Sequence, residues 1–182
     1  MREVLLVRFG EVHLKGLNRP YFLKMLVEDI KKVLSGMNAR VWLSEGRIYV
    51  ADAPDMSECA RRVSRVFGVY SVSPAVEMEK ELEPILAKAA DMMTGVTGSF
   101  KVICRRSDKR FPLNSQQLAV LAGERILEKN PSLTVDVHKP QTEMWIEIRD
   151  HAYLCNRELM AVGGLPMGTA GKALLLLSGG ID

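Results

Sequence analysis

The hydrophobic residues of the first 76 positions change period repeatedly, and this alternation restricts the fold more than any other feature. Strand-like apolar runs occupy residues 3–9, 39–43, 47–51 and 69–76, and helical spacing occupies residues 19–35 and 56–67. Ser44-Glu45-Gly46 separates the second and third runs and predicts a hairpin turn. The order strand, helix, strand, strand, helix, strand is that of the ferredoxin-like fold, a sheet with both helices on one face.

The helical spacing also predicts which side chains face this sheet. On the first helix they are Phe22, Leu26, Ile30 and Val33. On the second helix they are Cys59, Val63 and Val66.

A second strand-and-helix unit follows between residues 81 and 155. Helical spacing over 81–93 and 115–129 alternates with strand-like runs at 99–104, 133–137, 143–148 and 152–155. The helix at 115–129 has the strongest start signal, because Asn114 stands at its N-cap and Gln117 follows three residues later, as in a capping box. The whole pattern predicts an α+β fold.

The composition changes after residue 160. Residues 162–169 are rich in Gly and Pro and indicate a linker. The apolar run Ala173–Leu177 then has the character of a strand buried on both faces, as in a parallel sheet. Because such a strand needs neighbours that the remaining residues cannot supply, the sequence predicts that this chain is part of a longer protein.

Positive charge is concentrated in two blocks. Residues 1–40 carry eight Lys and Arg against four Asp and Glu, and residues 101–110 carry five against one, whereas the whole chain has a net charge of only +3. This distribution is expected if one surface meets a polyanion such as a nucleic acid. The alternative is that both blocks are ordinary solvated faces.

The candidate cations lie in two segments. Lys15 and Arg19 stand at the start of the first helix, where the helix dipole adds to their charge. The alternative there is simple helix capping. The second segment joins a strand to the helix at 115–129 and suits contacts to several phosphates, unless it is only a solvated loop. Its cations are Arg105, Arg106, Lys109 and Arg110.

The last five residues, Ser178-Gly179-Gly180-Ile181-Asp182, form a candidate phosphate site. Glycines after a buried strand expose backbone N–H groups to a phosphate, and the carboxylate of Asp182 would hold Mg²⁺ beside it. The alternative is a tight turn that follows a strand.

No catalytic residue is predicted within the chain. The three cysteines, Cys59, Cys104 and Cys155, contain no CxxC pair and indicate neither a disulfide framework nor a zinc site. Charged residues interrupt the first ten positions, unlike a signal peptide, and the longest aliphatic run is far shorter than the roughly 20 residues of a membrane span. These features predict a cytoplasmic protein without a membrane segment.

Three segments, in this order, resemble the tRNA 4-thiouridine synthetases, or tRNA sulfurtransferases. They are Val7–Arg19, the basic segment Arg105–Ser115, and Gly163–Thr169 followed by Leu177–Asp182. The resemblance implies an N-terminal ferredoxin-like domain over 1–55, whose last helix and strand extend to about 76, and a THUMP RNA-binding domain over 56–160. It further implies a linker over 161–171 and the first strand of a PP-loop α/β pyrophosphatase domain over 172–182.

The resemblance also implies an activity for the full-length protein. In the family, the first two domains bind the acceptor end of tRNA. The third uses ATP and Mg²⁺ to adenylate O4 of uridine 8, and a persulfide supplied by a cysteine desulfurase then delivers sulfur. The family also passes sulfur to the thiamine sulfur-carrier protein. By this resemblance the ATP contacts fall on Ala173, Leu174, Ser178, Gly179, Gly180 and Asp182, with Asp182 also at the metal.

The sequence departs from the family pattern at its end, because the serine that follows the motif's aspartate and the sulfur-carrying cysteines are not in it. We therefore expect this chain alone to bind tRNA without catalysis. Other interpretations stay open: a stand-alone THUMP RNA-binding adaptor, another THUMP tRNA-modifying enzyme such as a methyltransferase, or a small-molecule regulator. The oligomeric state also stays open, a homodimer included.

Overall fold

The computed structural model describes residues 1–172, which form two strand-and-helix units that share one sheet. The first unit runs through β1 (Arg2–Phe9), the 3₁₀ segment η1 (Glu11–Asn18), α1 (Arg19–Val33), β2 (Arg40–Ser44), β3 (Arg47–Ala51), α2 (Met56–Val63) and β4 (Val69–Met78). The second continues with α3 (Leu82–Met92), β5 (Ser99–Arg106), α4 (Ser115–Lys129), β6 (Thr134–Val135), β7 (Thr142–Ile148), β8 (Ala152–Cys155) and β9 (Leu159–Met160).

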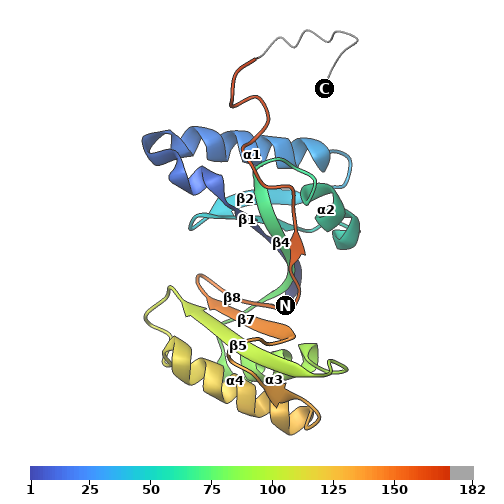
Figure 1. The fold of residues 1–182 in the computed structure, drawn as a ribbon, viewed down its shortest axis with the longest axis vertical. Helices are drawn as coiled ribbons and strands as arrows, with labels where there is room; N and C mark the ends of the chain where they lie inside the picture. The colour runs from blue at the N-terminus through green and yellow to red at the C-terminus, as the bar shows by residue number, and fades with distance from the viewer. Residues whose placement is uncertain (173–182) are drawn as a thin grey trace, which may run out of the picture.

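The long strand β4 joins the two units. The strand order is β2-β3-β1-β4-β8-β7-β5-β6, and β9 also pairs with β4. β4 pairs with β1 along most of its length and with β8 at its far end, from Val76 opposite Leu154 to Met78 opposite Ala152. Figure 1 shows β4 curving from one unit into the other, with α1 and α2 at one end of the molecule and α3 and α4 at the other.

Three hydrophobic cores hold this arrangement together. One lies between α1, α2 and the sheet, and a second lies between α3, α4 and the sheet. The third lies on the helix-free side and combines side chains of both units, among them Leu6, Tyr49 and Tyr153. Along β1, Leu5 and Val7 belong to the first core whereas Val4 and Leu6 belong to the third. This strand is therefore buried on both faces, which explains its uninterrupted apolar run.

The predicted fold class is confirmed, and the predicted face of the first helix is wrong in part. Leu26 and Ile30 are buried as expected, but Val33 is 37% exposed. Leu23 and Leu34 are buried in its place. The sequence contains two overlapping apolar stripes, and the helix turns the one with spacing 23, 26, 30 and 34 toward the sheet.

Other boundaries follow the sequence to different degrees. The capping box at Asn114 and Gln117 is confirmed, with both reciprocal hydrogen bonds present. The second helix ends at Val63, earlier than predicted, and the strand predicted over 133–137 is only Thr134–Val135. The 3₁₀ segment η1 and the short strand β9 have no counterpart in the prediction. Among the helices of residues 1–172, none has the length and apolar character needed to cross a membrane.

Candidate nucleic-acid interface

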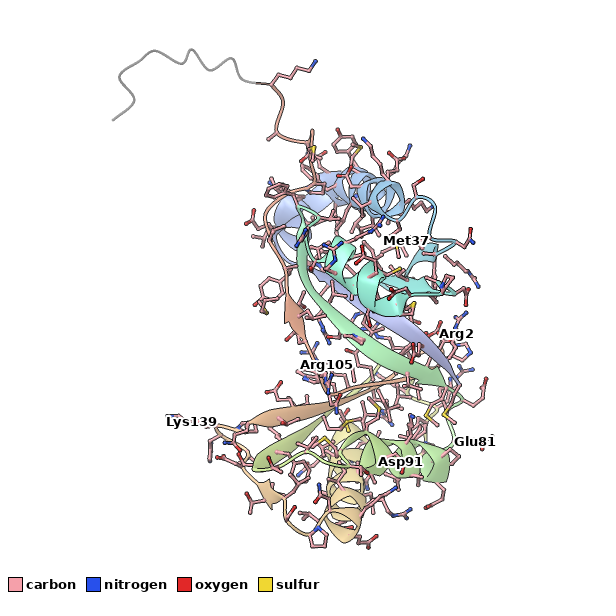
Figure 2. All side chains as sticks on the ribbon, turned by 90° about the vertical axis from the view of Figure 1, so that its right-hand side faces the viewer. Arg2, Met37, Glu81, Asp91, Arg105 and Lys139 are labelled. Carbon is pink, nitrogen blue, oxygen red and sulfur yellow. The ribbon has the colours of Figure 1, made fainter. Side chains whose placement is uncertain are left out.

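A pocket of about 340 Å³ opens between the two units, at the end of β1. Three of its lining residues are arginines, two from the first unit and one from the second, and none is a carboxylate. The lining residues are Val7, Arg8, Phe9, Gly10, His13, Gly46, Arg47, Tyr70 and Arg105. Figure 2 shows Arg105 at the junction of the units. Behind this lining, Arg47 is paired with Glu147 at 2.6 Å and Arg8 with Glu158 at 3.0 Å. Three guanidinium groups against these two carboxylates still leave an excess of positive charge, which suits the pocket to an anion.

Successive side chains of β5 point to opposite faces of the sheet, so the arginines of the predicted basic segment are divided between the two faces. Arg105 is exposed on the helix-free face and lines the pocket. Arg106 points the other way, and its guanidinium donates to the backbone carbonyls of Phe111 and Leu113, both at 3.1 Å. The structure therefore places Arg106 in a local structural role and separates it from the pocket.

The remaining cations of that segment lie in the loop after β5. Arg110 donates to both carboxylate oxygens of Asp108, at 2.9 and 3.0 Å, and Lys80 donates to the same carboxylate at 2.6 Å. The bonds from Arg110 and Lys80 hold the pKa of Asp108 well below its ordinary range. Lys109 is exposed beside them. This loop thus carries less free positive charge than its sequence indicates.

Lys15 and Arg19 lie on η1 and at the start of α1, outside the pocket lining. The Lys15 ammonium stands 5.2 Å from the centre of the Phe22 ring. Arg19 lies against the β2–β3 turn and lines a separate groove along α1. Arg19 is next to the pocket through Gly46 of that turn, which is one of the lining residues. The rings of Phe9 and His13, which also line the pocket, stack at 4.6 Å. Burial and the charge of Arg19 lower the pKa of His13.

Aromatic side chains accompany the pocket arginines, and the sequence analysis missed them. The guanidinium groups of Arg105 and Arg8 lie 5.0 and 5.7 Å from the centre of the Trp145 ring. Tyr70 is half exposed and packs beside Gly10, where an added Cβ would come within 3.6 Å of its ring. The Trp145 ring itself is partly buried against the third core. Aromatic rings next to arginines are typical of surfaces on which RNA bases stack.

Two pocket arginines, Arg8 and Arg47, also escaped the sequence analysis. Each is a charged residue directly beside an apolar run, after residues 4–7 in β1 and before residues 48–51 in β3, and this is the signal that could have revealed them. Both approach the carboxylate of Glu147, which is only 1% exposed: Arg47 donates to it at 2.6 Å and Arg8 lies at 3.8 Å. Arg149 donates to the other carboxylate oxygen at 3.0 Å. Three cations therefore surround one buried anion.

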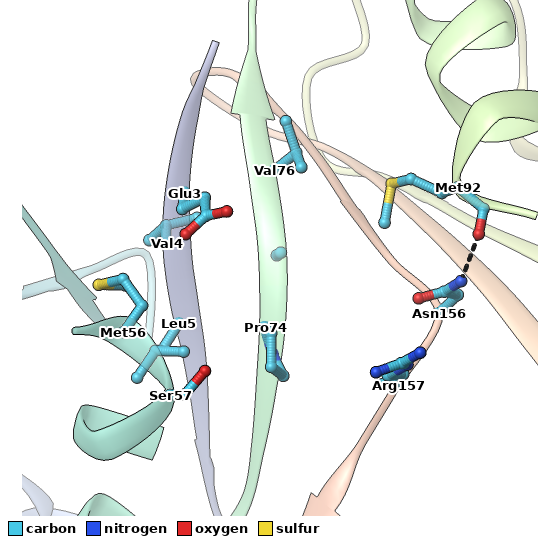
Figure 3. A pocket seen from close by; sticks show the side chains of 11 residues that line it. Glu3, Val4, Leu5, Met56, Ser57, Pro74, Val76, Met92, Asn156 and Arg157 are labelled. Carbon is cyan, nitrogen blue, oxygen red and sulfur yellow. Dashed lines mark hydrogen bonds between the residues drawn. The ribbon is translucent and has the colours of Figure 1, made fainter. Parts of the chain in front are cut away.

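A second pocket, of about 280 Å³, lies between α2 and the end of α3 (Figure 3). The side-chain amide of Asn156 donates to the carbonyl of Met92 at its edge, at 2.7 Å. Glu3 and Arg157 are the charged residues in its lining, and they offset each other. This pocket therefore lacks the net positive charge that binding to a polyanion requires.

The described cysteines are poorly suited to sulfur chemistry, which requires a thiolate. Burial raises the pKa of Cys104 to about 12 and also raises the pKa values of Cys59 and Cys155. Within residues 1–172, no three His, Cys, Asp or Glu side chains are grouped as metal ligands would be. The predicted ATP and Mg²⁺ contacts lie outside the described residues: Ala173, Leu174, Ser178, Gly179, Gly180 and Asp182.

Two family models match the chain, one for each unit. The model described as the ThiI ferredoxin-like domain matches residues 4–73, and the THUMP domain model matches residues 77–156. These matches divide the chain within β4, the strand that both units share.

Proteins similar to this chain include curated and structurally solved ones. A probable tRNA sulfurtransferase of Alkaliphilus oremlandii is 42% identical over the whole chain, which spans 48% of that protein. The crystal structure of PH1313 from Pyrococcus horikoshii superposes with a TM-score of 0.82 at 34% identity, over 92% of this chain and 58% of that one.

A crystal structure of a 4-thiouridine synthetase–RNA complex with bound ATP superposes with a TM-score of 0.85 at 28% identity. It matches all of this chain and 48% of its own. The chain thus spans about half the length of the curated relatives it matches. The two domain matches and the relatives that cover the full chain agree: the chain carries a ThiI ferredoxin-like domain and a THUMP domain, and over its whole length it is similar to part of the tRNA sulfurtransferases.

Proposed function

We propose that this chain is the tRNA-binding portion of an ATP-dependent tRNA sulfurtransferase that makes 4-thiouridine at position 8 of tRNA. The observation that carries the proposal is the pocket between the units, where Arg8, Arg47 and Arg105 converge and no carboxylate lines the wall. The similarity to tRNA sulfurtransferases supports tRNA as the ligand, and the arginines of the pocket account for the binding of its phosphates.

The pocket suits RNA in two respects. Guanidinium groups pair with phosphate oxygens in a fixed fork, and these contacts position an RNA without reading its sequence. The half-exposed ring of Tyr70 and the partly buried ring of Trp145 offer faces for unpaired bases, such as those at the acceptor end. Because the cations come from both units of one sheet, their spacing is set by the fold.

The chemistry of the full-length protein explains why RNA binding and ATP use belong together. Uracil O4 is a poor leaving group. Its attack on the α-phosphate of ATP releases pyrophosphate and leaves O4 attached to AMP. A cysteine desulfurase supplies the persulfide, whose outer sulfur then bonds to C4 as AMP departs with the oxygen. Attack of a second thiol on the inner sulfur breaks the S–S bond, which leaves sulfur on C4 and a disulfide between the two thiols. Tight holding of the tRNA brings the correct uridine into line with the phosphate.

The family resemblance extends the proposal to the residues after 172. ATP and Mg²⁺ would be held there by the SGGID segment, and the same protein would supply sulfur to the thiamine sulfur carrier. We propose a cytoplasmic enzyme of this kind, of which this chain alone binds tRNA without catalysis.

The test is binding of an unmodified tRNA transcript to this chain over a series of salt concentrations. Arg105→Ala should weaken binding about tenfold and reduce the slope of log affinity against log salt by about 0.7 to 0.9, the loss of one phosphate contact. The matched control is Arg125→Ala on α4, which removes the same charge from the helix-covered side. A wild-type chain that does not bind tRNA, or equal effects of the two substitutions, would overturn the proposal.

A further inference from the structure

The buried carboxylate of Glu147 connects the two units. Its Oε1 accepts from Arg47 of β3 at 2.6 Å and lies 3.8 Å from Arg8 of β1. Its Oε2 accepts from Arg149, which follows Glu147 in the second unit, at 3.0 Å. One oxygen therefore faces the first unit and the other faces its own.

The hydrogen bonds of Glu147 depend on the angle between the two units, whereas the contacts of the surrounding apolar core depend on it much less. Hydrophobic burial favours contact between the units but has little preference for one angle. A buried carboxylate, by contrast, is costly unless each oxygen has a partner at hydrogen-bonding distance. Burial alone would raise the pKa of Glu147, but the charge of Arg47 and the bonds from Arg149 outweigh it and lower that pKa, so the group is ionised at neutral pH.

The partners of Glu147 are themselves part of the pocket. Arg8 and Arg47 line it, and Arg8 also shares the Trp145 ring with Arg105. A second hydrogen bond also joins the two units: Arg149 of the second unit donates to the backbone carbonyl of Glu45 on the β2–β3 turn of the first, at 3.3 Å. Any change in the angle between the units would therefore move the pocket arginines relative to one another.

We propose that Glu147 is a positioning residue that fixes the angle between the ferredoxin-like and THUMP domains and, with it, the spacing of the pocket arginines. In this role it confers the preference for tRNA over other RNA, while the arginines supply the affinity for any RNA. The inference rests on the proposed tRNA-binding function.

The substitution Glu147→Gln distinguishes a positioning role from a purely electrostatic one, because the two roles predict opposite changes in tRNA affinity. Removal of a negative charge beside three arginines should tighten binding of every RNA if only charge matters. If Glu147 positions the arginines, tRNA should bind about tenfold more weakly, whereas an RNA duplex of equal length keeps or gains affinity. The measurement is the ratio of the two affinities at one salt concentration.

The matched control is Glu143→Gln. Glu143 lies on the same strand and the same face, is exposed, and accepts from the Trp145 indole N–H at 2.9 Å, which a glutamine oxygen can still do. It loses the same charge without touching an arginine of the cluster, so its ratio of affinities should stay within about twofold of wild type.

A second variant and a second measurement keep the inference testable if Glu147→Gln does not fold. Glu147→Asp keeps the charge but is one methylene shorter, so it cannot reach both Arg47 and Arg149. Spin labels on exposed positions of α1 and α4, at Lys31→Cys and Glu124→Cys, report the distance between the units. Both Glu147 variants should broaden the distance distribution, and Glu143→Gln should leave it unchanged.

The outcomes are distinct. A folded Glu147 variant with an unchanged distance distribution and an unchanged or raised preference for tRNA overturns the positioning role. A wild-type chain that binds tRNA no better than the duplex overturns the proposed function instead.

Discussion

The two tryptophans of the sheet occupy similar local settings in different units. Trp42 on β2 has the guanidinium groups of Arg40 and Arg2 at 4.9 and 5.2 Å from its ring centre. Trp145 on β7 has those of Arg105 and Arg8 at 5.0 and 5.7 Å. Both rings are partly buried against the third core. The first ring stacks on buried Tyr49, whereas the two arginines over the second ring line the pocket. The same pairing of tryptophan and arginine therefore lies away from the pocket in one unit and beside it in the other.

The helix-free faces of the two units are both divided between the junction and the pocket. In the first unit this face is apolar and buried at Leu6, and it carries the pocket residues Arg8 and Arg47 where β1 ends and β3 begins. In the second unit it changes along β7 from exposed Glu143 to buried Glu147. A position along the strand, and not the unit it belongs to, therefore decides whether a side chain serves the junction or the pocket.

The largest expected effect is on the junction. Tyr49 is 1% exposed and its ring lies 5.2 Å from both Trp42 and Tyr153. Tyr49→Ala should lower the free energy of unfolding by about 3–5 kcal/mol, because it removes a buried aromatic ring. Urea denaturation measures this loss. Tyr70→Ala removes a half-exposed ring of the pocket lining and should cost less than about 1 kcal/mol. Equal losses would contradict the contrast between the buried junction and the pocket.

The second effect compares the two tryptophans directly. Trp145→Ala should weaken tRNA binding by about 1–3 kcal/mol, roughly ten- to a hundredfold, because it removes a stacking surface beside the arginines. Trp42→Ala should leave tRNA affinity within about threefold and lower stability instead, since its ring stacks on buried Tyr49 and the arginines beside it, Arg2 and Arg40, do not line the pocket. Filter binding and thermal unfolding of both variants test this. The division of roles fails if the two variants lose tRNA affinity equally.

A smaller effect is expected at the start of α4, on the side of the second unit away from the pocket. Asn114→Ala removes the side chain that accepts from the Gln117 backbone N–H at 2.9 Å. It should cost about 1 kcal/mol of unfolding free energy, as for other N-cap losses. The tRNA affinity should not change. A drop in affinity with native stability would place α4 in the interface.

The smallest effect concerns the ion pairs of Asp108, whose side chain is 12% exposed. Because the bonds from Arg110 and Lys80 lower the pKa of Asp108 in the folded state, its stabilising contribution is present above the pKa of the unfolded chain. It is lost as the pH falls through the folded value. Asp108→Asn should therefore show a slightly smaller loss of stability than wild type between about pH 4 and pH 2. Thermal unfolding across this range measures it, and parallel curves would contradict the assignment.

Much of the local structure could be predicted from the sequence. The alternation of periods defined both units, and the Asn114–Gln117 pair defined the start of α4, because periodicity and capping depend on neighbouring residues alone. The same reasoning placed Arg105 and Arg106 together in one basic segment. It could not separate them, since their opposite roles depend on which face of β5 the helices cover.

The sequence by itself determined which residues form strands and helices, and that two basic blocks exist. Only the tertiary structure decided that Arg8 and Arg47 join Arg105, and that Glu147 lies among them. The reason is physical: the period of a strand assigns each side chain to a face, but its partner across the sheet depends on strand order and register. Here that register is set by β4, through its pairing with both β1 and β8.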